Sequence, residues 1–333
     1  MSRSVKKFLF LMFSVVMVMA IVMAINFKST KKISKASTVT KTGYFNTYSD
    51  VVNIEYDKNY TSAQAMNTYG GKVWHIKIAN DGTAKAGESR IWAYDLSAKK
   101  NNIIYNGNGS NYIFEIGHAN CMYVGKSSLY IATQEDGKAS IARYNIGTSG
   151  SKTYLYGRKN FKLYSHNTKV KTPISVTGIN YAAELGGFVV KSGNHIYAGN
   201  FSGDKFNWTK HYTIDTNLTV KANDGKTENI NVASYIKQGM FYRNGILYMP
   251  MVNDKKLNQS IVVAYKLDAS VANNAVLQER SDIFFRITSS KYSKLFEIED
   301  VARHNNALYC NANITDSTGK TYDKIIVFKN FTF

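Results

Sequence analysis

The sequence predicts an all-β fold, a five-bladed β-propeller, preceded by one hydrophobic helix at the N-terminus. Three observations lead to this prediction. A pattern of two short strands occurs five times, only two prolines interrupt the chain, and helical periodicity is absent after residue 30. The chain has 333 residues, of which 44% are hydrophobic and 13% aromatic, so one all-β domain can hold a large core.

The clearest copy of the two-strand pattern is the stretch 126–146. Apolar residues alternate through Ser128–Thr133 and again through Ser140–Ile146. The polar turn between them carries Asp136-Gly137, a dipeptide that favours a tight hairpin. This stretch is therefore expected to form two antiparallel strands.

Four further stretches repeat this hairpin, at Val73–Leu96, His195–Ile214, Ile246–Leu267 and Leu308–Asn330. The aromatic residues of the first strands are 51 to 67 residues apart; they are Trp74, Tyr130, Tyr197, Tyr248 and Tyr309. Units of roughly 40–60 residues with several short strands are typical of propeller blades. A single blade is too thin to bury both faces, so five of them should stack in a closed ring. The alternative is a β-sandwich whose hairpins are similar by accident.

Each blade also needs an innermost strand before its hairpin. The candidates are Ala63–Asn67, Gly117–Val124, Val176–Ala182, Lys237–Tyr242 and Ile298–Ala302. Innermost strands line the central channel, so their polar side chains should converge near one mouth. The predicted binding residues are Gln64, His118, Thr177, Gln238, Glu299 and Asp300. The third unit departs from the others, because the insert Ala182–Asn194 is expected to form a longer inner hairpin there.

The outer strands and the closure of the ring are less marked in the sequence. Asn102–Tyr105, Thr153–Tyr156 and Ile283–Ile287 are expected as outer strands, and Asn217–Asn231 as a projecting loop. Chain ends in propellers often share a blade, which leaves no open edge. We therefore expect Val51–Tyr56 to pair beside the final strand, Asp323–Phe333.

The N-terminus predicts export. Arg3, Lys6 and Lys7 precede the uncharged run Phe8–Ile25, which as a helix would be about 27 Å long, close to the thickness of a bilayer core. Small residues allow signal-peptide cleavage after Ala24. Cleaved signal and retained anchor both remain open. The expected domains are therefore 1–25, signal peptide or anchor; 26–45, basic flexible linker; and 46–333, propeller.

The charge indicates the class of partner. Lys and Arg total 42 against 23 Asp and Glu, a formal net charge of +19. Such a charge favours an anionic cell-envelope polymer or membrane surface, with a glycan as one form of the polymer. The alternative is a solvated basic surface, because the charge is spread along the chain. No nucleic-acid-binding motif is present, and we expect a monomer that is extracellular or anchored to the outer face of the cytoplasmic membrane of a Gram-positive bacterium.

The residues that carry reactive chemistry are few. Cys121 and Cys310 are expected on strands of different blades, as two buried free thiols. Glu297 and Glu299 should share one strand face, with Asp300 on the other. Glu299 and His118 could form an acid/base pair or a weak cation site across the channel. The alternative is that these groups only bind channel water and one another.

No other set of residues has the spacing of a metal site or a catalytic site. The remaining histidines are His75, His166, His195, His211 and His304, and they are scattered through the sequence. We therefore expect no metal site and no cofactor, and we assign no catalytic residue. Exposed tyrosines among the 24 could stack on sugar rings.

The chain contains three sets of short motifs: Gly117-His118-Ala119-Asn120 before Leu129–Thr133 and Tyr144-Asn145-Ile146; Gln238-Gly239 before Ile246-Leu247-Tyr248; and Glu297–Val301 before Leu308-Tyr309. Together these motifs resemble the helveticin J-like family of large bacteriocins. Thr177 departs from the family pattern, as does the N-terminal export segment with its basic linker. The resemblance implies a secreted antibacterial protein without an established catalytic set.

Three functions follow from these observations. The first is a bacteriocin-like antibacterial protein that binds the anionic cell envelope. The second is a membrane-anchored module at the cell surface that binds a glycan or a protein. The third is a glycan-acting enzyme at the central channel, with Glu299 and His118 as its reactive groups. The absence of a recognisable catalytic set favours a protein that is not an enzyme.

Overall fold

The computed structural model describes residues 42–45, 49–54, 59–79, 86–107, 111–135, 138–221, 227–253, 255–288 and 291–328. The hydrophobic segment 1–25, with its expected helix, and most of the linker 26–45 lie outside these residues. In the described part, no helix is long and apolar enough to cross a membrane. The chain there is all-β, and its one helical element is the 3-10 turn η1 (Ala183–Leu185).

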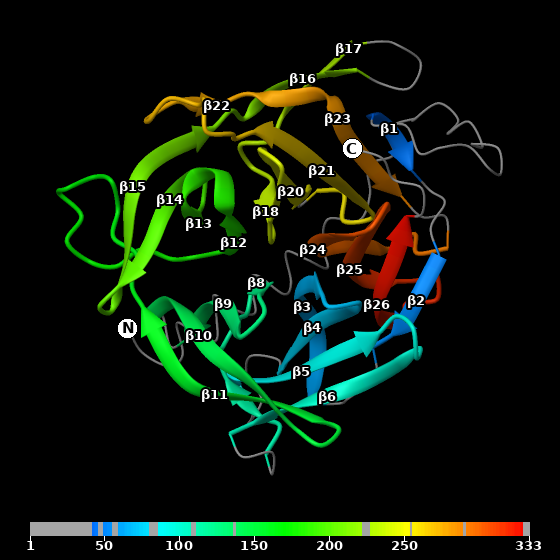
Figure 1. The fold of residues 1–333 in the computed structure, drawn as a ribbon. Helices are drawn as coiled ribbons and strands as arrows, with labels where there is room; N and C mark the ends of the chain where they lie inside the picture. The colour runs from blue at the N-terminus through cyan, green and yellow to red at the C-terminus, as the bar shows by residue number, and fades with distance from the viewer. Residues whose placement is uncertain are drawn as a thin grey trace, which may run out of the picture.

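Figure 1 shows the strands arranged in a ring of five sheet units, which we call blades 1 to 5 in chain order. Blade 1 contains β3 (Tyr60–Tyr69), β4 (Lys72–Ala79), β5 (Glu88–Asp95) and β6 (Lys100–Asn106), with β7 (Phe114–Glu115) beside β5. Blade 2 contains β8 (Cys121–Val124), β9 (Ser128–Glu135), β10 (Lys138–Ser149) and β11 (Lys152–Phe161). The outer strands β6 and β11 pair in parallel, which joins these two blades into one nine-stranded sheet.

The other blades follow the same plan from the axis outward. Blade 3 contains β12 (Gly178–Ala182), β13 (Gly187–Ser192), β14 (His195–Ser202) and β15 (Lys205–Ile214), with β22 (Val276–Leu277) at its edge. Blade 4 contains β18 (Ile236–Lys237), β19 (Phe241–Arg243), β20 (Ile246–Val252), β21 (Gln259–Lys266), β23 (Glu279–Thr288) and the early strand β1 (Thr42–Phe45). Blade 5 contains β24 (Leu295–His304), β25 (Ala307–Thr315) and β26 (Thr321–Phe328).

The ring closes as the sequence predicts. The early strand β2 (Ser49–Asn53) pairs antiparallel with β26, with Asp50 opposite Ile326. The backbone N–H of Ile54 extends this pairing to the carbonyl of Asp323 at 2.9 Å. The two ends of the described chain therefore complete blade 5 together, and this blade presents no unpaired edge at β26.

Blade 3 corrects the expected position of one hairpin. The sequence places His195–Ile214 as the second and third strands of its blade, whereas β14 and β15 are the third and fourth. The insert 182–194 supplies η1 and β13, which pairs with β12 along its whole length. The extra hairpin moves the repeated motif one strand outward, which is why its spacing from Thr177 is longer.

Two other expectations concern loops and cores. The segment 217–231 forms a hairpin of β16 (Asn217–Lys221) and β17 (Thr227–Asn231), not a loop, and the residues 222–226 between the two strands lie outside the described residues. The repeated aromatic positions face the core: Trp74, Tyr197, Tyr248 and Tyr309 are buried. Neighbouring blades meet through aromatic contacts, as where Tyr130 of blade 2 lies 4.7 Å from Phe188 of blade 3, between ring centroids.

Candidate binding site

The inner strands of neighbouring blades contact one another around the axis. Asn67 of β3 donates to the carbonyl of Met122 in β8, and the Gly239 N–H donates to the carbonyl of Glu299 in β24. The Cys121 thiol lies 3.4 Å from the carbonyls of both Ile179 and Met240. Blades 2 and 4 therefore meet across the axis, and the middle of the ring is filled by protein.

Three carboxyl groups lie buried in this filled region. Glu297, Glu299 and Asp300 have relative exposures of 5%, 4% and 0%. Gln238 donates to Glu297 at 2.8 Å and Asn313 donates to Glu299 at 2.6 Å. Asp300 accepts from the backbone N–H groups of Met66 at 3.0 Å and Val301 at 2.9 Å. We call these three residues the axial carboxyl cluster.

A β-bulge in β24 explains why the three carboxyl groups are so close together. Ile298 pairs with Ala312 and Asp300 pairs with Asn311, which leaves Glu299 as the additional residue. A bulge breaks the strict alternation of side chains along a strand. The strict alternation behind the expectation for Asp300 therefore does not hold at Glu299, and the two residues have different hydrogen-bond partners.

Burial raises the pKa of all three carboxyl groups. For Glu299, burial raises the pKa well above its usual range, and the negative charge of Glu297 adds to the effect. Burial raises the pKa of Glu297 against the hydrogen bond from Gln238. Burial also raises the pKa of Asp300, although two backbone N–H groups and the Lys191 ammonium act in the opposite direction. The cluster thus favours protonated carboxyl groups, which can donate as well as accept hydrogen bonds.

Lys191 is the buried cation of this region. Burial lowers its pKa to about 8, and its ammonium donates to the backbone carbonyls of Lys237 and Gln238. Gly178 and Gly239 allow the close approach of the neighbouring strands. A Cβ atom on Gly239 would lie 2.2 Å from the Asp300 carboxylate. The central region is therefore a tightly packed polar core.

The predicted binding residues fall into two groups. Gln64, Gln238, Glu299 and Asp300 belong to this polar core: the carbonyl of Gln64 accepts from Asn311, and Asn313 joins Glu299 to the neighbouring Ala63. Thr177 belongs to the second group, because it contacts this polar core only through its backbone N–H, which donates to the Lys191 carbonyl. His118 lies in the segment before β8, where its carbonyl accepts from Asn120. Asn313 is the side-chain hydrogen-bond donor to Glu299, and the pairing of Glu299 with His118 stays a prediction.

Exposed side chains gather where the inner strands end. Tyr69 and Tyr181, at the ends of β3 and β12, have relative exposures of 39% and 44%. Half-buried Tyr123 of β8 stacks on Tyr181 with ring centroids 5.9 Å apart and an angle of 29° between the rings. Tyr69 is also close enough to Tyr123 for a charge on its hydroxyl to raise the pKa of Tyr123. Blades 1, 2 and 3 therefore each contribute one tyrosine to the same region, at the ends of their inner strands.

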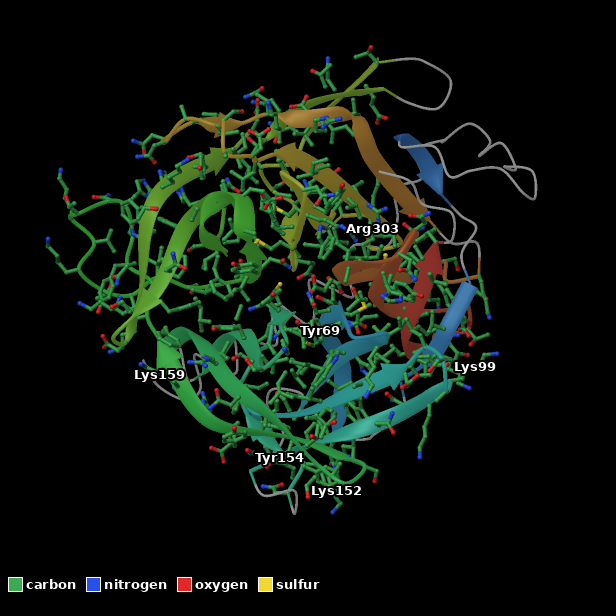
Figure 2. The ribbon with its side chains drawn as sticks, viewed as in Figure 1. Tyr69, Lys99, Lys152, Tyr154, Lys159 and Arg303 are labelled. Atoms are coloured by element: carbon green, nitrogen blue, oxygen red, sulfur yellow. The ribbon has the colours of Figure 1, made fainter. Side chains whose placement is uncertain are left out.

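The other two blades contribute arginines at the same level. Arg243 ends β19, Arg303 stands one residue before the end of β24, and each is near enough for its charge to act on the other. The hydroxyl of Thr68, next to Tyr69, donates to the carbonyl of Arg303 at 2.7 Å. Figure 2 shows Tyr69 and Arg303 near the centre of the ring, whereas Lys99, Lys152 and Lys159 lie at its periphery. We call Tyr69, Tyr123, Tyr181, Arg243 and Arg303 the tyrosine–arginine patch.

Sequence reasoning placed the binding residues at the start and middle of the inner strands and missed this patch. A signal was present: Tyr69 precedes Gly70-Gly71, and Arg243 precedes Asn244-Gly245. A turn directly after an inner strand marks where that strand reaches the surface. Alternation alone identifies which residues face the axis, but it does not indicate at which depth they lie.

The structure agrees with the expectation for the two cysteines but not with the expectation for three of the histidines. Cys121 and Cys310 are buried free thiols, as expected. The expectation of scattered histidines is wrong for His166, His195 and His211, since one nitrogen of each lies within 4.8 Å of the others. The strand pairing of blade 3 brings together residues that are far apart in sequence, which spacing along the chain could not show.

Comparison with known proteins gives limited results. No family model and no curated protein sequence matches the chain, so the resemblance to the helveticin J-like family stays an expectation. The solved structures that resemble the chain include a glycoside hydrolase with 10% identity, a TM-score of 0.44, and coverage of 86% of this chain and 92% of the other.

Two other solved structures are similar at the same level. One is a GH43 β-xylosidase/α-arabinofuranosidase from a compost microbial metagenome, with 10% identity, a TM-score of 0.43 and coverage of 84% and 93%. The other is a xylan β-1,4-xylosidase from Bacillus halodurans, with 9% identity, a TM-score of 0.41 and coverage of 81% and 53%. These values are too low to carry residues or chemistry across to this chain.

Proposed function

We propose that this protein binds an acidic polysaccharide through the tyrosine–arginine patch. The observation that carries the proposal is that three tyrosines of blades 1 to 3 and two arginines of blades 4 and 5 stand at or near the ends of the inner strands, where the Thr68 hydroxyl beside Tyr69 bonds to the Arg303 carbonyl. Each of the five inner strands contributes one of these residues at or near its end. A chain with a net charge of +19 also attracts anionic polymers before contact.

The tyrosines suit the faces of sugar rings. Tyr69 and Tyr181 expose 39% and 44% of their surface, while the stacked contact of Tyr123 with Tyr181 fixes the orientation of that pair. Tyrosine offers a flat apolar body and a polar hydroxyl, and it costs little conformational entropy on binding. Tyrosine and arginine are also the residue types that most often contribute large binding energies.

The arginines suit the acidic groups of such a polymer. Arg303 donates to the Asn305 carbonyl and to the Asn306 side chain, which orients its guanidinium at the end of β24. Burial and the neighbouring charge of Arg243 lower the pKa of Arg303. An anion beside both guanidinium groups would relieve their repulsion and form charge-assisted hydrogen bonds with them.

This geometry favours binding over hydrolysis. Glycoside hydrolysis needs two carboxyl groups on either side of a sugar bond. Glu297 and Glu299 lie instead in the packed centre, with 5% and 4% exposure and protein donors on both. An exported location outside the cytoplasmic membrane agrees with this proposal, and an antibacterial effect would be a further property of the bound protein.

The experiment is a binding titration of the full-length chain with teichoic acid and with polygalacturonate, with a neutral glucan for comparison. We expect binding to the acidic polymers that weakens as salt rises. Tyr69→Ala, Tyr181→Ala and Arg243→Gln should each weaken binding at least about fivefold, which corresponds to about 1 kcal/mol.

Matched controls lie on the outer strand of blade 2. Tyr156→Ala removes an equally exposed tyrosine, at 47%, and Arg158→Gln removes an exposed arginine. Both should leave the affinity unchanged. Failure to bind either acidic polymer, or equal losses in the patch and control variants, would contradict the proposal.

A further inference from the structure

Three histidines from separate parts of the chain meet on blade 3. His195 begins β14 and His211 lies in β15, on neighbouring strands. His166 comes from the segment 162–177 that connects β11 to β12, and its ring stacks on His211 with centroids 3.8 Å apart and an angle of 14°. One nitrogen of each histidine lies within 4.8 Å of the other two.

A ring nitrogen of His195 in β14 already faces a ring nitrogen of His211 in β15. His195 Nδ1 lies 3.0 Å from His211 Nε2. Two imidazole nitrogens on one tetrahedral zinc ion, each about 2.0–2.1 Å from it, lie about 3.4 Å apart. Only a small separation of these two rings is therefore needed to admit a metal ion between them.

The surrounding groups hold the rings as metal sites require. The Asn274 Oδ1 atom only accepts hydrogen bonds, so its 3.3 Å contact fixes a proton on His211 Nδ1 and leaves Nε2 with a lone pair. The Tyr197 hydroxyl lies 3.0 Å from His166 Nδ1, which directs the other nitrogen of His166 away from it. Metal-binding histidines usually donate their second N–H to such a partner.

Burial favours the neutral form of two of the three imidazoles. It lowers the pKa of His195 and of His211, and the charge of His166 acts in the same direction on both. His211 is 5% exposed, while His166 and His195 are half-buried, so the cluster combines a fixed inner ligand with two that reach solvent. Neutral imidazole is the form that binds metals.

We propose that His166, His195 and His211 form a binding site for a divalent transition-metal ion of the zinc class. Three imidazoles suit zinc, copper and nickel better than calcium or magnesium, which prefer oxygen ligands. The three ligands leave a fourth position for water or an added ligand. This site is separate from the tyrosine–arginine patch, and it does not depend on the function proposed for the patch.

The expected consequence is a cross-link between two parts of the ring. His166 belongs to the connection between blades 2 and 3, while His195 and His211 belong to the sheet of blade 3. A metal ion that binds all three would fasten the connecting segment to the sheet. Because it binds the folded chain and not the unfolded one, it should raise the unfolding temperature.

The test uses the full-length chain without a polyhistidine tag, first stripped of metal by a chelator. Titration calorimetry with Zn²⁺ should give one ion per chain, and Co²⁺ should give the visible absorption of a tetrahedral site. Zn²⁺ should raise the unfolding temperature, while Ca²⁺ should leave it unchanged. His166→Gln, at a half-buried position on a connecting segment, and His211→Gln should each weaken Zn²⁺ binding at least about tenfold.

His304→Gln serves as the control, since it removes a half-buried histidine at the end of β24 in blade 5. It should bind Zn²⁺ like the original chain. If His211→Gln fails to fold, the comparison of His166→Gln with His304→Gln decides the matter. No Zn²⁺ binding, a Co²⁺ spectrum that His166→Gln leaves unchanged, or equal weakening by His304→Gln would overturn the proposal.

Discussion

The middle and the end of the same inner strands differ sharply in this protein. In β24, Glu299 is 4% exposed and accepts a hydrogen bond from Asn313, whereas Arg303, four residues further on, is half-buried beside the patch. In β3, Gln64 is 4% exposed and Tyr69 is 39% exposed. Depth along the axis, more than residue type, thus separates polar groups that stabilise the ring from groups that are available to a ligand.

The difference also shows why polar residues on inner strands do not by themselves indicate a binding site: they can equally stabilise the centre of the ring. A narrow ring brings opposite strands into contact, as Cys121 and Met240 show, so its polar groups must bond to one another. The strand ends diverge towards solvent and leave side chains uncovered. Four substitutions, ordered by expected effect, test this division.

The largest effect is expected for the buried ion pair between blades 1 and 5. Lys77 Nζ lies 2.8 Å from Asp323, and the two side chains are 2% and 6% exposed. Lys77→Met should lower the free energy of unfolding by about 3 kcal/mol, because it leaves a buried carboxylate without its cation. Urea unfolding measures the change. Lys266→Met breaks the exposed pair with Asp268, at 54% and 36% exposure, and should cost less than about 1 kcal/mol.

The next effect tests the packing at the axis. In Gly239→Ala, the new Cβ atom would lie 2.2 Å from the Asp300 carboxylate, which must move and disturb its hydrogen bonds from Met66 and Val301 unless the strands separate. We expect a loss of about 2–3 kcal/mol in the free energy of unfolding. Gly125→Ala, where the nearest atoms lie at 3.4 Å, is the control. Similar unfolding curves for the two variants would show that the centre is looser than the structure indicates.

A smaller effect concerns pH. Because the pKa of Glu299 is higher in the folded chain than in the unfolded one, the folded chain holds more protons in the interval between these values, and stability falls as pH rises through it. Glu299→Gln keeps the acceptor for Asn313 and removes the charge. The decline of the unfolding free energy from pH 5 to 8 should become shallower, by at most about 1.4 kcal/mol per pH unit.

Unfolding of both proteins at several pH values measures this difference. The remaining carboxyl groups of the region, Glu297, Asp300 and Asp323, still titrate, so part of the decline should persist. Glu115→Gln, at an exposed position in β7, should leave the decline unchanged. An equal slope in Glu299→Gln would show that this carboxyl group has an ordinary pKa.

The smallest effect on stability is expected at the patch. Tyr69→Ala should change the free energy of unfolding by less than about 1 kcal/mol, because the side chain is 39% exposed at a strand end. Binding of acidic polysaccharide should nevertheless weaken in this variant. A large loss of stability would make Tyr69 part of the core and would remove the contrast between the strand middle and the strand end.

Much of the architecture follows from local patterns. Alternating apolar residues and turn dipeptides located β9 and β10, and the expected outer strands at 102–105, 153–156 and 283–287 correspond to β6, β11 and β23. Closure by an early strand beside β26 was predicted because an open edge is costly. Strand formation depends on near neighbours, so a single sequence contains the information.

The site depends on contacts that no local pattern contains. The bulge at Glu299 interrupts the alternation of side chains along β24, and the repeated hairpin of blade 3 lies one strand further out than its motif predicts, although the inner hairpin before it was expected. The pairing of β14 with β15, and the connecting segment 162–177 packed against it, bring His166, His195 and His211 together across 45 residues of chain. By itself, the sequence predicted most of the strands and which of them lie innermost. Only the tertiary structure decided which polar groups are buried and which reach solvent, because depth in the ring depends on how all five blades pack.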